Sequence, residues 1–331
     1  MNKSDIIRQL LAGRSREPDA QGAAYAPANI ALCKYWGKRD EELNLPVTSS
    51  LSLSLGSLGA HTEVSACDGP DRVQLDGREL PPDSPFAKRL SAYLDLFREN
   101  HGFDVRTESS VPVAAGLASS ASGFAALVLA LNDLYGWELD RTALSILARL
   151  GSGSACRSIF QGFVEWHAGS RPDGMDSYAE PLQAEWPDLR LGLLELSTAE
   201  KAVGSRAGMK NTVETSALYS AWPEKVADDL LDLHTAIKER DFERLGRAAE
   251  SNALSMHATM FSAWPPLCYW LPESVHAMRA IWRLRNDGLP LYFTMDAGPN
   301  LKLLFLDADR ARVASHFPAM RVVESNERGM S

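Results

Sequence analysis

A run of small residues from Val111 to Gly123, VPVAAGLASSASG, has the composition of a phosphate-binding loop. It leads into an apolar stretch that is predicted to form a helix. At a helix N-terminus, backbone N–H groups and the helix dipole favour phosphate, and serine hydroxyls can donate to phosphate oxygens or ligate Mg²⁺. No Gly-Lys-Ser/Thr follows, so this is not a Walker loop, and a turn with a serine N-cap is the alternative. The small residues are Gly116, Ala118, Ser119, Ser120, Ser122 and Gly123.

Two lysines lie four residues apart in the segment from Asn29 to Asp40, NIALCKYWGKRD. Lys34 and Lys38 come just after an apolar stretch that is predicted to be a strand. Two cations beside aromatic rings suit a bound anion, whereas the alternative is a strand end with solvated lysines. The residues between the two lysines are Tyr35, Trp36 and Gly37.

The segment from Gly151 to Arg157, GSGSACR, combines small residues, hydroxyls and a guanidinium. Backbone N–H groups, serine hydroxyls and a bidentate arginine together can hold a diphosphate. A flexible connector with a solvated arginine is the alternative. The residues before Arg157 are Ser152, Gly153, Ser154, Ala155 and Cys156. A fourth candidate segment, from Lys201 to Met209, contains Ser205 and Arg206.

Asp296 lies between an apolar strand and a Gly-Pro pair in the sequence FTMDAGPN. A carboxylate at a strand end can point into a cleft and accept a proton, although most such residues belong to turns. His167, His257 and His276 lack the spacing of metal ligands and are expected to be structural.

The elements that must position these residues follow from the hydrophobic pattern. Alternation of leucine and serine over residues 50–55 predicts a strand with one buried face, and residues 62–67 predict another strand. From Leu189 onward the order is strand, helices, strand, strand, helix, strand, which is that of a split β-α-β unit with inserted helices. The first 185 or so residues are therefore expected to form a β-rich domain with helices, and the remainder an α+β sandwich.

Composition excludes several classes of protein. The 331 residues are 45% hydrophobic and 23% charged, with a net charge of −9, so binding to nucleic acid or to an anionic membrane is not expected. No apolar run approaches the roughly 20 residues of a membrane span. The four cysteines are far apart in sequence, which favours reduced thiols in a cytosolic protein. The N-terminal residues are predicted to form a short amphipathic helix or a loose arm.

Taken together, these segments resemble the diphosphomevalonate decarboxylase family of the GHMP kinase superfamily. Recognisable blocks run from about residue 26 to 306, and the N-terminal arm lies outside them. One departure is Val113, where the family usually has threonine. The matching blocks span residues 29–53, 112–123, 151–158, 208–216, 252–260 and 293–300.

The resemblance implies an α+β GHMP kinase fold with the active site in the cleft between two domains. The expected divisions are an arm at 1–25, a ribosomal-protein-S5-like ATP-binding domain at 26–185 and a ferredoxin-like domain at 186–331. It also implies a cytoplasmic homodimer.

The implied reaction is ATP-dependent decarboxylation of (R)-5-diphosphomevalonate to isopentenyl diphosphate, with ADP, phosphate and CO₂, in the mevalonate pathway. By resemblance, Asp296 takes or orients the C3 hydroxyl proton, Lys34 shares its cleft and Ser205 lies near C3, with Arg157 as a further catalytic candidate. The implied substrate-binding residues are Tyr35, Trp36, Gly37, Lys38, Arg89, Ser152, Gly153, Ser154, Ala155, Cys156, Arg157, Arg206 and Met209. ATP and Mg²⁺ are expected at Gly116, Ala118, Ser119, Ser120 and Ser122, with Ser119 and Ser120 as metal ligands.

Three alternatives stay open on the sequence. A GHMP small-molecule kinase shares the small-residue loop but should lack the KYWGK and DAGPN segments, which are present here. A decarboxylase of another mevalonate phosphate is disfavoured by the GSGSACR segment. A non-catalytic relative that regulates a partner should have lost Asp296 or Lys34, and both are present.

Overall fold

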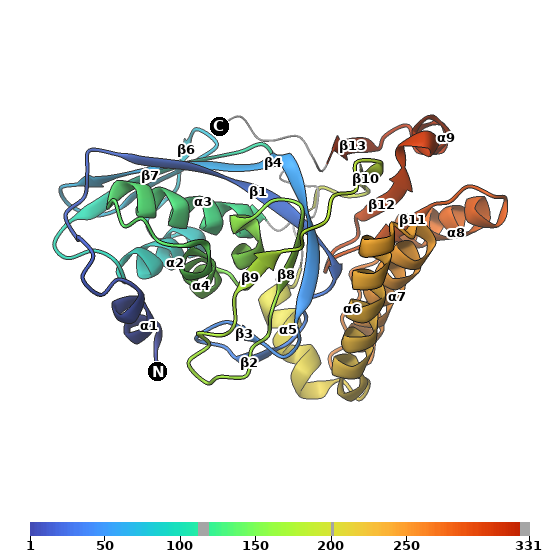
Figure 1. Cartoon of the computed structure of the whole chain (residues 1–331), viewed down its shortest axis with the longest axis horizontal. Coiled ribbons are helices and arrows are strands. Elements are labelled where there is room, and N and C mark those ends of the chain that lie inside the picture. Colours follow the sequence, from blue (N-terminus) through green and yellow to red (C-terminus); the bar gives the residue numbers. More distant parts are fainter. Residues whose placement is uncertain (112–118, 200–201, 325–331) are drawn as a thin grey trace.

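The computed structural model describes residues 1–111, 119–199 and 202–324. Two β-sheets, each with its own helices, lie side by side along the long axis of the molecule (Figure 1). The strands of the first sheet all precede residue 182, and those of the second all follow residue 188.

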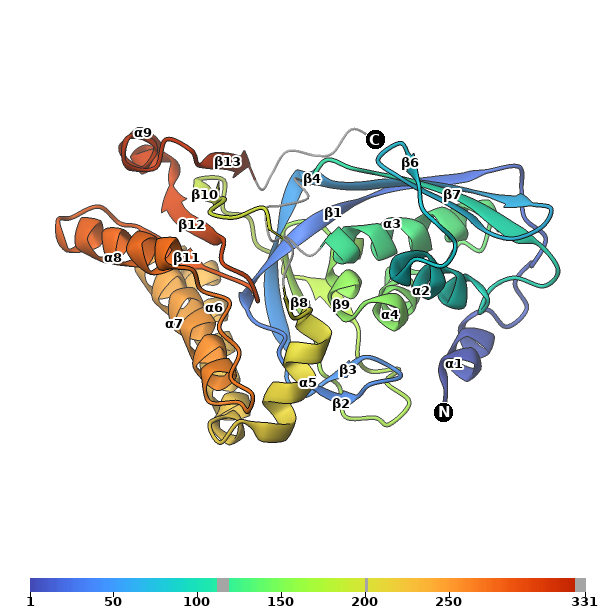
Figure 2. The same cartoon turned by 180° about the vertical axis from the view of Figure 1, so that it is seen from behind.

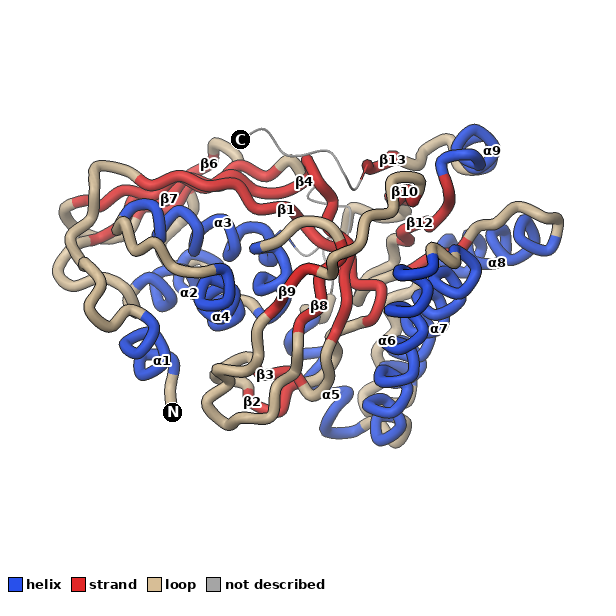
Figure 3. Tube along the Cα trace, viewed as in Figure 1, coloured by secondary structure: helices blue, strands red, loops and turns tan. Residues whose placement is uncertain are grey.

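The first sheet has the strand order β6-β5-β7-β4-β8-β9, and β1 pairs with β4 off this path. Helices α2, α3 and α4 lie together on one side of it (Figure 3). Its strands are β1 (Gly22–Cys33), β4 (Ser50–Cys67), β5 (Arg72–Leu75), β6 (Arg78–Glu79), β7 (Gly102–Ser109), β8 (Phe163–Trp166) and β9 (Ala179–Pro181). The hairpin strands β2 (Lys38–Asp40) and β3 (Leu45–Pro46) pair separately. The helices are α2 (Pro85–Leu94), α3 (Ser119–Leu134), α4 (Arg141–Gly151) and the 3₁₀ turn η1 (Gly153–Ile159).

The second sheet has the order β11-β12-β10-β13 with antiparallel neighbours throughout. Together with the chain order, this is the split β-α-β arrangement that the sequence predicted. Its strands are β10 (Leu189–Leu194), β11 (Tyr292–Thr294), β12 (Leu301–Leu306) and β13 (Arg321–Glu324). Its helices are α5 (Ser205–Thr215), α6 (Trp222–Glu239), α7 (Phe242–Phe261), α8 (Pro272–Asn286) and α9 (Arg310–His316), with 3₁₀ turns η2 (Tyr219–Ala221) and η3 (Asp307–Asp309). From behind, α5 lies between the β2–β3 hairpin and the long helices α6 and α7 (Figure 2).

The prediction of one buried face at residues 50–55 was wrong, because β4 is buried on both. The leucines at 51, 53 and 55 belong to a core cluster that includes Leu189 and Trp222 of the second part. Ser50, Ser52 and Ser54 are buried as well, and Ser50 accepts a hydrogen bond from Arg157 of η1. This end of β4 lies between the two halves of the molecule, so each face has a neighbour. The serine face of β4 therefore packs against polar groups of the protein and is not exposed to solvent.

The two strands expected at residues 50–55 and 62–67 are one strand of 18 residues. Between them the pairing with β1 jumps from Ser54↔Asn29 to Gly59↔Pro27, so β4 carries extra residues at this point. Gly56 has a φ of 56°, a value that glycine adopts without the strain that a Cβ would add. A bulge of this kind interrupts the alternation of side chains, and the pattern therefore resembles two strands.

The N-terminal segment forms a helix, α1 (Lys3–Leu10), and not a loose arm. The Asn2 side chain caps it by accepting from the N–H of Asp5, whose carboxylate accepts from the N–H of Asn2 in return. Ile6 and Ile7 are buried in the same cluster as residues of α4, so the helix is part of the first core.

None of the described helices has the length and apolar character that crossing a membrane requires.

Candidate active site

A cavity of about 660 Å³ lies where the two halves of the molecule meet. Its walls come from the end of β1, the β2–β3 hairpin, α2, the start of α3, η1, α5, α7 and the loop between β11 and β12. Residues far apart in the chain thus share one space. The lining includes Lys34, Arg157 and Asp296, the charged groups singled out by the sequence.

Asp296 is held from three directions. One carboxylate oxygen, Oδ1, lies 2.9 Å from the Lys34 Nζ, and the other, Oδ2, lies 3.4 Å from the Lys302 Nζ. His257 donates from Nε2 to the Asp296 carbonyl oxygen at 3.1 Å, since a carbonyl can only accept. The two lysine side chains are 2% exposed and the Asp296 side chain 28%, so the carboxylate reaches the cavity in front of its counter-ions.

Lys34 is fixed by a chain of buried contacts that crosses from β1 to the second half of the molecule. Its backbone N–H donates to Asn252 Oδ1 of α7 at 2.8 Å, and Asn252 Nδ2 donates to Asp229 Oδ2 at 2.8 Å. Asp229 forms an ion pair with Lys225. Burial lowers the pKa of the Lys34 ammonium, and the neighbouring Asp296 carboxylate opposes that shift.

Arg157 lies at the base of the cavity with its guanidinium oriented by two neighbours. Its Nε and Nη2 donate to Asn29 Oδ1 at 3.2 and 3.1 Å, and its Nη1 donates to Ser50 Oγ at 2.6 Å. A guanidinium carries five N–H groups, so this arrangement engages three and can direct two toward a ligand. The Trp166 ring lies beside it, with the guanidinium carbon 5.9 Å from the ring centroid.

Further cations lie along the cavity wall. Lys38, Arg89 and Arg206 all line it, and Lys38 Nζ lies 2.9 Å from Glu41 Oε2. Burial lowers the pKa of Lys38 and of Arg89, and the charge of Arg206 lowers each of them further. Groups that repel one another in this way are stabilised by a ligand with several negative charges.

The start of α3 opens on the same cavity. Ser120 lines it, and the Ser120 Oγ and Ser152 Oγ are 3.5 Å apart. The N-terminus of this 16-residue helix favours phosphate, because the first N–H groups of a helix have no partner within it. Within the described residues no cluster of three His, Cys, Asp or Glu side chains could hold a metal ion. The hydroxyls of Ser120 and Ser152 are oxygen donors of the kind that suit a Mg²⁺ ion arriving with nucleotide phosphates.

Comparison with known proteins matches two family models to this chain. Residues 26–179 match the diphosphomevalonate decarboxylase-like N-terminal domain, and residues 193–329 match the mevalonate 5-diphosphate decarboxylase C-terminal domain. The diphosphomevalonate decarboxylase of Bos taurus is 38% identical over 320 residues, which cover 88% of this chain and 78% of that protein. The chain belongs to the diphosphomevalonate decarboxylase family.

Solved structures of the family agree with the fold. The mevalonate diphosphate decarboxylase of Staphylococcus aureus has a TM-score of 0.88 and 37% identity, covering 94% of this chain and 97% of its own. A complex of MDDEF with MVAPP, AMPPCP and magnesium has a TM-score of 0.86 and 42% identity, covering 92% and 96%. The expected α+β GHMP kinase fold is therefore confirmed.

Most of the residues that the sequence singled out meet in this one cavity. Those that line it are Lys34, Tyr35, Trp36, Lys38, Arg89, Ser120, Ser152, Gly153, Ser154, Arg157, Ser205, Arg206, Met209 and Asp296. Gly116 and Ala118 lie outside the described residues, as does the side chain of Ser119. The expected roles of all these residues stay predictions.

Four expected residues are not among those that line the cavity. The side chains of Ala155 and Cys156 are fully buried in the core, because η1 turns them away from the ligand side. Ser122 is also fully buried, two residues further along α3 than Ser120. The backbone conformation at position 37 requires glycine: φ is 115°, and a Cβ there would collide with the Tyr219 hydroxyl.

The sequence analysis missed the residues that hold the charged pair in place. Asn252 lies in a block that carried the family resemblance but received no role, and His257 of the same block was expected only to be structural. Lys302 follows the DAGPN segment within an apolar strand, LKLLFL. A lysine in a buried strand is rare unless it is paired with a carboxylate. Its place in this apolar sequence was therefore the signal that a counter-ion lies near Lys302.

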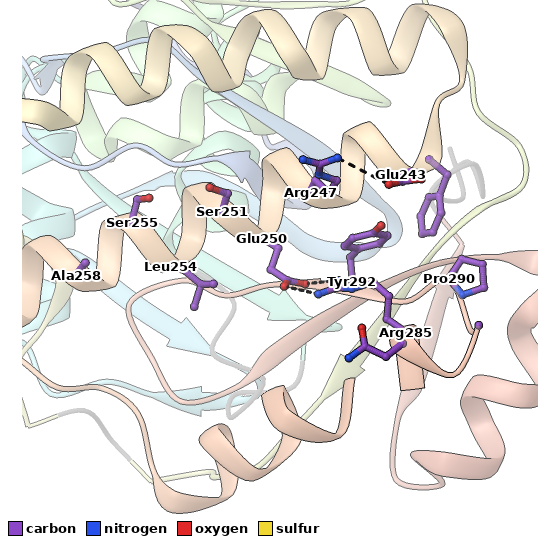
Figure 4. Close-up of a pocket in the computed structure, with 13 residues that line it drawn as sticks. Glu243, Arg247, Glu250, Ser251, Leu254, Ser255, Ala258, Arg285, Pro290 and Tyr292 are labelled. Atoms are coloured by element: carbon purple, nitrogen blue, oxygen red, sulfur yellow. Dashed lines mark hydrogen bonds and ion pairs between the residues drawn. The ribbon is translucent and has the colours of Figure 1, made fainter. Parts of the chain in front are cut away.

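A second, larger cavity of about 940 Å³ lies on α7 and the end of α8 (Figure 4). Its charged groups already satisfy one another. Arg285 Nη2 lies 2.9 Å from Glu250 Oε1, Trp282 Nε1 donates to the same carboxylate at 2.7 Å, and the Arg285 guanidinium stacks 4.3 Å from the centre of the Tyr292 ring. None of the candidate catalytic or ligand-binding residues named from the sequence lines it. We therefore assign the chemistry to the smaller cavity.

Proposed function

We propose that this chain catalyses the ATP-dependent decarboxylation of (R)-5-diphosphomevalonate to isopentenyl diphosphate, with ADP, phosphate and CO₂ as the other products. The observation that carries the proposal is the buried Lys34–Asp296 pair, open to a cavity that cations and the start of α3 surround. The family match supports the substrate. The reaction is a step of the mevalonate pathway of isoprenoid biosynthesis.

The reaction presents two difficulties that the cavity can meet. A tertiary alcohol is a crowded nucleophile, and hydroxide is a poor leaving group. Transfer of the γ-phosphoryl group of ATP to the C3 oxygen replaces the poor leaving group with phosphate. Departure of that phosphate with the C3–O electrons and loss of CO₂ from C2 then leave the C1–C2 bonding pair as the new double bond between C2 and C3. Mg²⁺ bound with ATP would neutralise phosphate charge during the transfer.

In this proposal Asp296 accepts, or orients, the proton of the C3 hydroxyl. Its carboxylate is the exposed end of the buried pair, so it can reach a substrate in the cavity. Lys34 supplies positive charge to the substrate carboxylate and to the phosphate in transfer, and Ser205 lies on the wall where it can approach C3. Positioning and charge neutralisation together supply the rate enhancement that such phosphoryl transfers need.

The remaining predicted residues hold the rest of the ligands. We assign the substrate diphosphate to Arg157, Arg206 and Lys38, with the backbone of Ser152 to Ser154 beside them. We assign the ATP phosphates and the accompanying Mg²⁺ to the start of α3. The domain division at 185 is part of the proposal, since the first sheet ends at Pro181 and the second begins at Leu189. We propose no separate domain before residue 25, because that position lies within β1 and α1 packs into the first core. We further propose a homodimer in the cytoplasm, which the family resemblance and the four free cysteines favour.

One assay tests the function. Purified protein receives Mg-ATP with each mevalonate phosphate in turn, and ADP and CO₂ are measured together. Equal amounts of both products from the 5-diphosphate support the proposal. ADP without CO₂ identifies a small-molecule kinase, and the absence of both from every substrate indicates a protein that only binds the metabolite.

A change at Ser120 tests the phosphate site at the start of α3. Replacement by alanine removes a hydroxyl that faces the cavity, so we expect a higher KM for ATP or a lower kcat with the fold intact. A lost hydrogen bond to a charged group is worth about 1.5–3 kcal/mol, which corresponds to about a ten- to hundredfold change. Steady-state kinetics against ATP and circular dichroism provide the measurements. A lowered melting temperature with unchanged ATP kinetics would instead assign Ser120 to the stability of the helix.

A further inference from the structure

Lys302 places a second buried ammonium group behind the catalytic carboxylate. It lies on β12, in the middle of the second sheet, and faces Leu193 of β10 and Thr294 of β11 across the ladder. Its side chain is 2% exposed, and its Nζ lies 3.4 Å from both Asp296 Oδ2 and the Asn300 carbonyl oxygen. Burying an ammonium group is costly unless a counter-ion is present. The contact with Asp296 supplies that counter-ion.

The two lysines beside Asp296 differ in what they can reach. Lys34 lines the cavity, whereas Lys302 is absent from its lining and approaches the opposite carboxylate oxygen. A bound substrate brings a carboxylate and phosphates into the cavity, and these compete with Asp296 for the charge of Lys34. They cannot compete in the same way for Lys302, because it lies behind Asp296 and not in the cavity wall.

We propose that Lys302 is a positioning residue for the decarboxylation reaction: it keeps Asp296 ionised and aimed at the cavity while Lys34 is engaged by the anionic substrate. This inference rests on the proposed function. A carboxylate with a single counter-ion would lose that partner when substrate binds, in a cavity where further negative charge has just arrived. A second, fixed ammonium group preserves the ionised form through that step.

The other groups that face Asp296 cannot serve as the counter-ion that stays with it when the substrate binds. Arg157 of η1 acts on it electrostatically, but its guanidinium is engaged by Asn29 and Ser50 and lines the ligand side. His257 of α7 contacts the Asp296 backbone, and burial lowers its pKa to about 3, so it is neutral at working pH. With Lys34 of β1 engaged by the substrate, Lys302 is the cation that stays beside the carboxylate.

The test is the pH dependence of CO₂ release by wild type, Lys302→Met and Lys302→Arg. Methionine keeps the length of the side chain and removes the charge, so we expect the acid limb of kcat to move upward by about one pH unit, the lower end of the effect of a nearby charge on a carboxylate. KM for both substrates should change little. Arginine keeps the charge, so its acid limb should stay close to that of wild type. Lys302→Gln is the second neutral variant in case the methionine variant does not fold.

A structural role for Lys302 predicts a different result. The loss of a packing residue would lower kcat by the same factor at every pH, and such a profile, or an unmoved one, overturns the inference. The matched control is Arg285→Met, which removes the cation of another largely buried ion pair in the same half of the molecule, one that lines the other cavity. It should lower the melting temperature without moving the acid limb. A wild-type enzyme that releases no CO₂ would reject the proposed function. If the wild type releases CO₂ and the acid limb of Lys302→Met does not move, only the role of Lys302 is rejected.

Discussion

Asp296→Asn is expected to lower kcat by roughly 100-fold or more, the range that general acid–base catalysis supplies. Asparagine has nearly the same shape but no negative charge, so it cannot take the C3 hydroxyl proton. KM for 5-diphosphomevalonate should change little, because Arg157, Arg206 and Lys38 hold the charged groups of the substrate in our assignment. Steady-state CO₂ release at saturating substrates is the measurement. A turnover close to that of wild type would contradict the role.

The same substitution has a structural consequence that needs its own control. Asp296 is the counter-ion of two buried lysines, Lys34 and Lys302, and its neutralisation should also lower stability. Glu250→Gln is the matched control, because Glu250 is a buried carboxylate paired with Arg285 outside the active site. We expect the control to lose stability and to keep its kcat. A similar loss of kcat in both variants would assign the effect at Asp296 to folding.

The sequence predicted the elements well where a pattern has one physical cause. The helix predicted after the small-residue run and the order of elements after Leu189 are confirmed, because each follows from the hydrophobic pattern of its own segment. The prediction failed where a strand has two partners. The serines of β4 look like a solvated face, and only the presence of the second half of the molecule shows that they are buried.

The residues of the candidate site likewise fall into those that the sequence could predict and those that it could not. Residues with a distinctive chemistry in a distinctive segment, such as Lys34, Arg157 and Asp296, could be found from the sequence, and the fold brings them into one cavity. The residues that orient them could not. Asn252 acts through the backbone of Lys34, and His257 through the carbonyl of Asp296. Such contacts join positions more than 30 residues apart, and no local pattern records them.

Lys302 is an intermediate case. Its position in the strand LKLLFL predicts burial, and a buried lysine requires a counter-ion. The sequence could therefore have indicated that some carboxylate lies near it. Which carboxylate this is depends on how the β11–β12 loop turns, since that loop brings Asp296 back over the start of β12.

Arg157→Lys is expected to lower kcat/KM for 5-diphosphomevalonate by about ten- to hundredfold, the worth of a charged hydrogen bond of about 1.5–3 kcal/mol. KM for ATP should stay nearly unchanged, because the ATP phosphates are assigned to the start of α3. Lysine carries one point charge and cannot form the fork that bridges Asn29, Ser50 and a ligand. Kinetics with each substrate varied in turn provide the measurement.

The buried position of Arg157 means that this variant also needs a stability control. Arg98→Lys removes a comparable fork, since Arg98 Nη2 donates to Asp71 Oδ2 at 2.7 Å with its side chain 16% exposed, away from the active-site cavity. We expect Arg98→Lys to lower the melting temperature and to leave kcat/KM for the diphosphate unchanged. A change in kcat/KM of the same size in both variants would remove Arg157 from the binding site.

Substrate preference is the sharpest consequence of the same assignment. If Arg157 and the GSGSACR turn hold a diphosphate, removing the terminal phosphate leaves buried donors without acceptors, which costs more than the contact itself. Wild-type enzyme should therefore strongly prefer 5-diphosphomevalonate to 5-phosphomevalonate, and Arg157→Lys should narrow that preference by weakening only the larger substrate. Equal kcat/KM for the two substrates would overturn the substrate assignment even if CO₂ were released from both. Arg157 and the GSGSACR turn would then not distinguish a diphosphate from a monophosphate.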